Sequence, residues 1–144
     1  MNVLVAYESQ RGHTRQTAEA IATAVRAQGG EVVVKPVADV RAGDVQDADV
    51  LFVGTWVQGF ILFGVRPAGA AQWVPDLPPL MGKPVGVFCT YAFNPRSSLR
   101  ALDRMLEACG ATVLGEHAFH RARPSDGAEQ FVGGVLKSAG VVLR

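Results

Sequence analysis

Short apolar runs alternate along this chain with stretches in which apolar residues recur every three to four positions. Uninterrupted apolar runs at residues 2–7, 50–53 and 84–90 are typical of strands buried on both faces of a sheet. Residues 31–37 and 111–120 have the composition of two more strands. Because strands that alternate with helices form right-handed parallel crossovers, we expect an α/β fold, a five-stranded parallel sheet with helices on both faces.

The helical spacing falls into three stripes. They comprise Ala18, Ile21, Ala22 and Val25; Leu99, Leu102, Met105, Leu106 and Cys109; and Ala128, Phe131, Val132, Val135, Leu136 and Ala139. Residues 60–82 are rich in glycine and proline and predict mostly loop, with a short helix near residues 68–73. Five strands in 144 residues suit one three-layer, doubly wound domain over residues 1–144, with strand order 2-1-3-4-5 and a ligand crevice at the carboxyl ends of the first and third strands.

The charge pattern removes two classes of partner. The formal net charge is +1, and acids and bases are interspersed, so we expect neither nucleic acid nor a membrane surface as partner. No apolar stretch approaches the length of a membrane helix, and Met1 leads directly into the first expected strand, so we expect a cytoplasmic location. Cys89 and Cys109 are expected to be reduced core thiols, and no cysteine or histidine spacing suggests a metal.

The turn after the first strand is built to bind an anion. It consists of Ser9, Gln10, Arg11, Gly12, His13 and Thr14. Such a turn can direct backbone N–H groups, two hydroxyls and the positive end of a helix dipole at one phosphate. It lacks the lysine of a nucleoside-triphosphate loop and the additional glycines of a dinucleotide fingerprint, so a monophosphate fits better than a pyrophosphate.

Two further segments follow the third and fourth strands and would line the other walls of the crevice. The first contains Thr55, Trp56, Val57, Gln58 and Gly59, and the second contains Thr90, Tyr91, Phe93 and Asn94. An indole on such a segment is well shaped to stack on a flat heterocycle. Tyr91 or Phe93 would serve on the opposite face, and the choice between them is open.

Taken together, the three segments resemble the phosphate loop and the two ring-flanking loops of flavodoxins, in the same order and over essentially the whole chain. The resemblance implies that all the residues named in these segments bind FMN. It also implies that the protein carries electrons, cycling the flavin between oxidised, semiquinone and reduced states, with no residue acting as general acid or base. A peptide within residues 57–59 would turn to hydrogen-bond the reduced ring. The chain lacks the insertion in the last strand of larger flavodoxins and is therefore similar to the short-chain members.

Two departures from the resemblance leave alternatives open. The nearly neutral charge differs from the acidic surface of electron-carrier flavodoxins. One alternative is therefore an NAD(P)H-dependent flavin or quinone reductase, or an oxidase, of the same fold, and a second is an anion-binding module without flavin. The apolar run Phe60, Ile61, Leu62 and Phe63 suggests a contact with a protein, a redox partner, a reductase or a second subunit. The sequence disfavours a receiver domain, which needs acidic residues at the end of the third strand, and a small tyrosine phosphatase, which needs a cysteine on the first loop.

Overall fold

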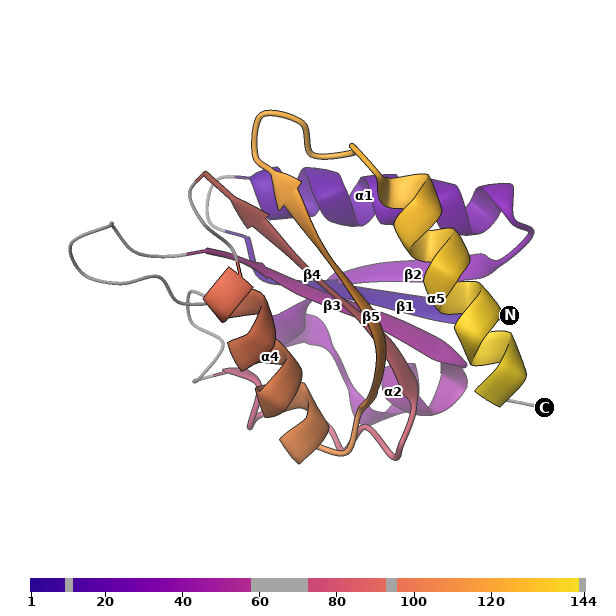
Figure 1. Cartoon of the computed structure of the whole chain (residues 1–144). Helices are drawn as coiled ribbons and strands as arrows, with labels where there is room; N and C mark the ends of the chain where they lie inside the picture. The colour runs from indigo at the N-terminus through magenta and orange to yellow at the C-terminus, as the bar shows by residue number, and fades with distance from the viewer. Residues whose placement is uncertain (10–11, 58–72, 93–95, 143–144) are drawn as a thin grey trace.

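A five-stranded, all-parallel sheet forms the centre of the molecule. The computed structural model describes residues 1–9, 12–57, 73–92 and 96–142 (Figure 1). The strands are β1 (Asn2–Tyr7), β2 (Glu31–Pro36), β3 (Val50–Trp56), β4 (Pro84–Tyr91) and β5 (Thr112–His120). They lie in the order β2-β1-β3-β4-β5, which confirms the predicted topology. The order in which the chain adds strands switches sides between β1 and β3. In sheets of this kind the ligand crevice lies at the carboxyl ends of the two strands at this switch point.

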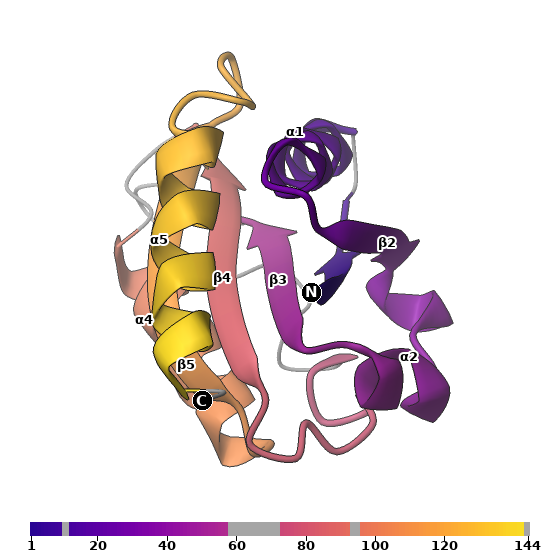
Figure 2. The same cartoon turned by 90° about the vertical axis from the view of Figure 1, so that its right-hand side faces the viewer.

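Helices cover both faces of this sheet. They are α1 (His13–Ala27), α2 (Ala42–Asp47), α4 (Arg96–Ala108) and α5 (Ala128–Val142), with a single 3₁₀ turn, η1 (Val37–Asp39). Helices α1 and α5 pack on one face and α2 and α4 on the other, as the two views show (Figures 1 and 2). The three predicted stripes are the buried sides of α1, α4 and α5, because each places its apolar residues every three to four positions.

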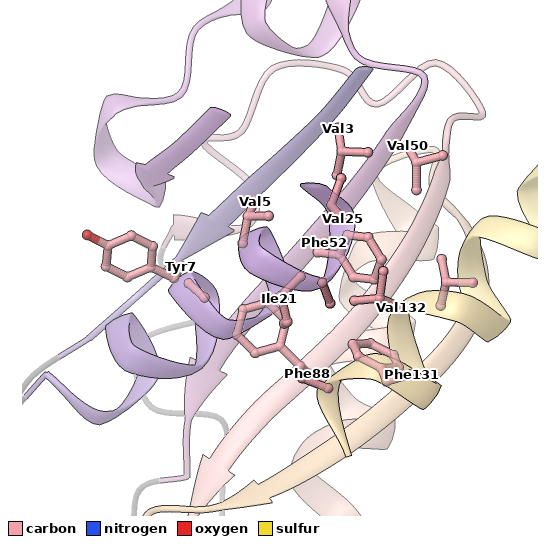
Figure 3. Packing of buried hydrophobic residues seen from close by; sticks show 14 of the residues in the cluster. Val3, Val5, Tyr7, Ile21, Val25, Val50, Phe52, Phe88, Phe131 and Val132 are labelled. Carbon is pink, nitrogen blue, oxygen red and sulfur yellow. The ribbon is translucent and has the colours of Figure 1, made fainter. Parts of the chain in front are cut away.

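The core between the sheet and helices α1 and α5 combines aliphatic side chains with several aromatic rings (Figure 3). Phe52 of β3 lies edge-on to Phe131 of α5, with ring centroids 5.4 Å apart. Two glycines make room for the rings: Gly86 is paired with Phe52 and Gly54 with Phe88 on the neighbouring strand. A Cβ atom at Gly86 would lie 2.7 Å from the Phe52 ring, and one at Gly54 would overlap the Phe88 ring. Each phenylalanine therefore occupies the space that its partner glycine leaves.

The structure departs from the sequence prediction between residues 37 and 56. Strand β3 continues three residues beyond Val53, because Gly54, Thr55 and Trp56 pair with Phe88, Cys89 and Thr90 of β4. Helix α2 and the turn η1 were not predicted: α2 has six residues and one buried side chain, Val45, which is too little for a periodic signal. The short helix expected near residues 68–73 falls almost entirely on residues that the structure does not describe.

Both cysteines are free thiols, as expected, with Cys89 buried and Cys109 half-buried. None of the helices in the described ranges combines the length and the apolarity needed to cross a lipid bilayer.

Candidate functional site

The turn between β1 and α1 depends on one left-handed residue. Gly12 has φ +88° and directly precedes the first helical residue, His13. Glycine adopts this conformation at no steric cost, whereas residues with a Cβ atom rarely do. The N–H of Gly12 donates to Ser9 Oγ at 3.0 Å, which holds the turn closed. The turn therefore presents the start of α1 toward the crevice.

The start of α1 is open to an anion. Within the described residues, no side chain caps the helix and its first turn carries no acid. The first N–H groups of a helix have no intrahelical acceptor, and together they carry a partial positive charge. His13 and Ser9 are half-buried beside these groups, and Arg15 is exposed. An anion with several oxygens would satisfy the unpaired donors.

Thr14 connects this helix start to the far wall of the crevice. Its hydroxyl lies 2.8 Å from the hydroxyl of Thr90 at the end of β4, and both side chains are almost fully buried. Two hydroxyls carry two hydrogens, and one bond between them uses only one. In the part of the chain that the structure describes, neither hydroxyl has a second hydrogen-bond partner. The pair thus keeps one buried O–H donor next to the open end of α1.

Strands β3 and β4 place the two expected aromatic residues at neighbouring ends. Trp56 is half-buried and pairs with Thr90, and the N–H of Val57 donates to the Thr90 carbonyl at 2.8 Å. Tyr91 is half-buried on the next residue of β4, and its ring stands edge-on to His120 at 5.2 Å. Because the Val57 N–H is bonded to β4, the peptide between Trp56 and Val57 is fixed, and any turning peptide would lie beyond it.

Thr55 lies inside strand β3, whereas the sequence pattern places it in the segment after the strand. It is fully buried within β3, and its hydroxyl donates to the Glu8 carboxylate at 2.6 Å. The N–H of Glu8 also donates to the Gly54 carbonyl at 2.9 Å, so Glu8 continues the β1–β3 pairing by one residue. Thr55 therefore positions Glu8 at the crevice and has no free hydrogen of its own.

Sequence reasoning missed two contributions to this region. Glu8 was not singled out, although its place directly after a buried strand is a usable signal. The connection between β5 and α5 was also missed: Thr17 of α1 donates to the carbonyl of Pro124 at 2.7 Å, and the N–H of Arg121 donates to the Tyr91 carbonyl at 2.9 Å. This connection follows the carboxyl end of a parallel strand, the same rule that located the other segments.

Several expected site residues lie outside the described residues. These are Gln10, Arg11, Gln58, Gly59, Phe93 and Asn94, together with the apolar run Phe60, Ile61, Leu62 and Phe63. The described members of the expected set, from Ser9 and Gly12 to Tyr91, gather at the carboxyl ends of β1, β3 and β4.

Cys89, next to the site in β4, is chemically quiet. Burial, together with the nearby Glu116 and Asp103 carboxyls, raises the pKa of its thiol to about 12. Since the thiolate is the reactive form, Cys89 packs as a small apolar residue.

The donors of the site suit an anion with several oxygens, such as a phosphate monoester. They comprise an uncapped helix start, a left-handed glycine without a side chain, and a buried O–H donor from the threonine pair. The half-buried aromatic residues Trp56 and Tyr91 stand at the ends of the two strands next to it. A phosphate attached to a planar ring system, as in FMN, matches this division into polar and aromatic parts.

Comparison with known proteins also indicates a protein that binds FMN. The family model described as Flavodoxin matches residues 5–133. A flavodoxin from Megasphaera elsdenii is 32% identical over 114 residues, which cover 78% of this chain and 82% of that protein. The solution structure of two-electron reduced M. elsdenii flavodoxin superposes with a TM-score of 0.78 at 28% identity and covers 94% of this chain and 98% of that one. A flavodoxin from Streptococcus pneumoniae, 22% identical, shares the fold with a TM-score of 0.76 over 96% and 99% of the two chains. The chain therefore belongs to the flavodoxin family of FMN-binding electron-transfer proteins.

Proposed function

We propose that the phosphate of FMN binds at the start of α1, on Ser9, Gly12, His13 and Thr14. The flavin ring then lies between Trp56 and Val57 on one side and Tyr91 on the other. The observation that carries this assignment is the Thr14–Thr90 hydroxyl pair, whose remaining hydrogen has no acceptor among the described residues. A buried donor without an acceptor is costly. A phosphate oxygen at the end of α1 would supply that acceptor.

The bound flavin supplies the chemistry, because it accepts and releases electrons singly or in pairs. The residues of this chain bind and orient it. Backbone N–H groups of α1 hold the phosphate, while Trp56 and Tyr91 exclude water from the ring. Gln10, Arg11, Gln58, Gly59, Thr90, Phe93 and Asn94 belong to the same proposal on the strength of the family resemblance.

We propose that the protein acts as a carrier that passes these electrons to and from partner proteins. An NAD(P)H-dependent reductase remains the alternative. The two functions separate in one assay: a carrier loaded with FMN does not oxidise NADH or NADPH unless a reductase is added. A cytoplasmic location, expected from the sequence, stays a prediction, as does a protein contact at Phe60 to Phe63.

The site is tested by titrating the purified, FMN-free protein with FMN. We expect quenching of flavin fluorescence with a dissociation constant in the micromolar range or tighter. Thr14→Ala and Gly12→Val should each weaken binding, whereas Thr23→Ala, on the exposed side of the same helix, should not. Equal affinity in all four proteins would refute the assignment of the phosphate to this turn.

A further inference from the structure

The ring of Tyr91 packs against the ring of His120. The two residues are paired at the ends of β4 and β5, and their ring centroids lie 5.2 Å apart with 79° between the ring planes. Edge-to-face packing of this kind stabilises aromatic pairs beyond the area that they bury. The N–H of Arg121 also donates to the Tyr91 carbonyl at 2.9 Å. Both the backbone and the side chain of Tyr91 are therefore held by the end of β5.

His120 is itself held by the connection that follows β5. Its ring Nδ1 accepts the N–H of Ala122 at 3.1 Å, and its carbonyl accepts the N–H of Arg123 at 2.8 Å. A ring nitrogen that accepts a hydrogen bond carries no hydrogen, so the neutral imidazole has its proton on Nε2. The imidazole cannot turn over without losing the bond from Ala122, and its orientation toward Tyr91 is fixed.

The same connection is bonded to the helix that begins at the proposed phosphate site. The carbonyl of Pro124 accepts the hydroxyl of Thr17 at 2.7 Å, so the connection lies against α1 (Figures 1 and 2). Thr17 lies one helical turn after Thr14, whose hydroxyl meets the end of β4. The contacts therefore form a closed loop, which runs from Tyr91 through the connection to α1 and back to β4.

We propose that His120 is a positioning residue for FMN, which holds the Tyr91 ring in the orientation that flanks the flavin. This inference rests on the proposed function, because that function places Tyr91 beside the flavin ring. A side chain that is ordered before the ligand arrives loses little freedom on binding. His120 acts through Tyr91, so its loss affects the flavin only as far as the Tyr91 ring moves.

The first test is FMN binding to the FMN-free protein, measured by quenching of flavin fluorescence. His120→Ala removes the ring contact, and it should raise the dissociation constant about two- to tenfold, the amount expected when one side chain must be ordered on binding. His120→Phe keeps an aromatic ring next to Tyr91 and should bind FMN within about twofold of the wild-type affinity. Wild-type affinity in His120→Ala, or equal losses in the two variants, would overturn the inference.

His117 provides a matched control. It is a half-buried histidine of the same strand, but its ring packs on Phe119 and on Phe131 of α5. His117→Ala should lower the free energy of unfolding, measured in urea, while it changes the affinity for FMN by less than about twofold. An equal loss of affinity in His117→Ala and His120→Ala would show a general effect of histidine loss from β5 and would overturn the inference.

A double-mutant cycle tests whether His120 acts through Tyr91. Tyr91→Ala should weaken FMN binding by itself. Once Tyr91 is alanine, His120→Ala should change the dissociation constant by less than about twofold, because no ring is left to hold. The same effect of His120→Ala with and without the Tyr91 ring would overturn the inference.

The midpoint potentials of the bound flavin supply an independent readout. Water that reaches the ring past a displaced Tyr91 would stabilise the negative charge that the ring gains on reduction. The potential for transfer of the second electron should therefore become less negative in His120→Ala and return toward the wild-type value in His120→Phe. Spectroelectrochemical titration of the FMN-loaded proteins measures these potentials. Identical potentials in the wild-type protein and His120→Ala would overturn the inference.

Failure of the inference and failure of the proposed function give different results. A wild-type protein that binds no FMN would refute the proposed site and the inference with it. Wild-type affinity in Tyr91→Ala would refute the place of Tyr91 at the flavin ring, and again the inference with it. Weaker binding in Tyr91→Ala together with unchanged binding in His120→Ala would refute only the role of His120.

Discussion

The hydroxyl oxygens of Thr14 and Thr90 lie 2.8 Å apart although the two residues are 76 positions apart in the chain. This contact joins the first turn of α1 to the carboxyl end of β4, and it crosses the crevice between two of the proposed FMN contacts. Both side chains are buried away from water, so the bond gives each hydroxyl a hydrogen-bond partner and leaves one hydroxyl hydrogen over.

The threonine pair predicts strongly non-additive mutants. Thr90→Val keeps the shape of the side chain but leaves the buried Thr14 hydroxyl without a partner, which should cost about 1–3 kcal/mol in the FMN-free protein. Thr14→Val should cost a similar amount. The double variant should lose clearly less than the sum of the two, because it leaves no orphaned hydroxyl. Urea unfolding of the four proteins measures all three changes.

Thr23→Val is the control for this cycle, because Thr23 is exposed and its hydroxyl donates to the Glu19 carbonyl of its own helix. Its effect should stay within about 0.5 kcal/mol. Additive losses at Thr14 and Thr90 would mean that the hydroxyl pair does not act as a unit.

Gly54 should tolerate no side chain. The Cβ atom of Gly54→Ala would overlap the ring of Phe88, which is itself fully buried, so the core must shift. Overpacking of this kind costs about 1–3 kcal/mol. Gly134→Ala is the matched control: the position is exposed on α5, and no atom lies within 4 Å of the added carbon. It should instead stabilise the protein by up to about 1 kcal/mol, because alanine is the better helix former. Thermal unfolding measures the change in stability of both variants. A loss of stability in Gly134→Ala as large as that in Gly54→Ala would contradict the packing argument.

Substitutions of Gly12 should lower stability through backbone strain and not through a steric clash. Nothing lies within 4 Å of a Cβ atom there, but the φ of +88° is unfavourable for residues with a side chain. Gly12→Ala should therefore cost about 1–2 kcal/mol of stability, and Gly12→Asn less, since asparagine adopts the left-handed conformation more readily. Urea unfolding of the FMN-free proteins measures this order, and an alanine variant as stable as the glycine protein would contradict it.

Asp103 should make stability fall as pH rises. Burial, a hydrogen bond with Glu116, and the charges of Glu116 and Glu107 raise the pKa of the Asp103 carboxyl from 3.8 to about 8. One of its oxygens, Oδ1, is buried without a hydrogen-bond partner among the described residues. Because the pKa is higher in the folded state, the folded chain binds this proton more tightly. The stabilisation is complete below pH 3.8, the ordinary value, and is lost as pH rises through about 8.

The measurement is the melting temperature between about pH 6 and about pH 9. Asp103→Asn should reduce its decline over this range and should stabilise the protein at the alkaline end. Asp76→Asn, at an exposed position, should leave the decline unchanged. An unchanged decline in Asp103→Asn would show that this carboxyl is already charged at neutral pH.

Most of the sheet could be predicted from the sequence, because parallel strands buried on both faces leave uninterrupted apolar runs such as residues 2–7 and 84–90. Helix α2 could not, since one buried valine in six residues gives no period. The end of β3 was missed because Gly54, a residue that is depleted in strands, was taken as the end of the run, although Thr55 is of a type that strands favour. Both are explained only by their partners in β4, the Phe88 ring and Cys89.

The candidate site also has a part that could be predicted from the sequence and a part that could not. Ser9, Gly12 and Thr14 could be found locally, because a hydroxyl-rich turn between a strand and a helix is readable in one segment. The roles of Glu8, Thr17 and Pro124 depend on contacts between distant segments: Thr17 and Pro124 are 107 residues apart. No local pattern contains that information, although the rule for carboxyl ends of parallel strands identifies the right segments.

The threonine contact also affects when the protein can acquire its cofactor during synthesis. Thr14 leaves the ribosome early, whereas Thr90 and the end of β4 follow many residues later. A nascent chain that ends before β4 has the helix start but neither the second hydroxyl nor the strand that fixes Val57. With FMN bound as proposed, its capture by the growing polypeptide would wait until more than half of the protein has been translated.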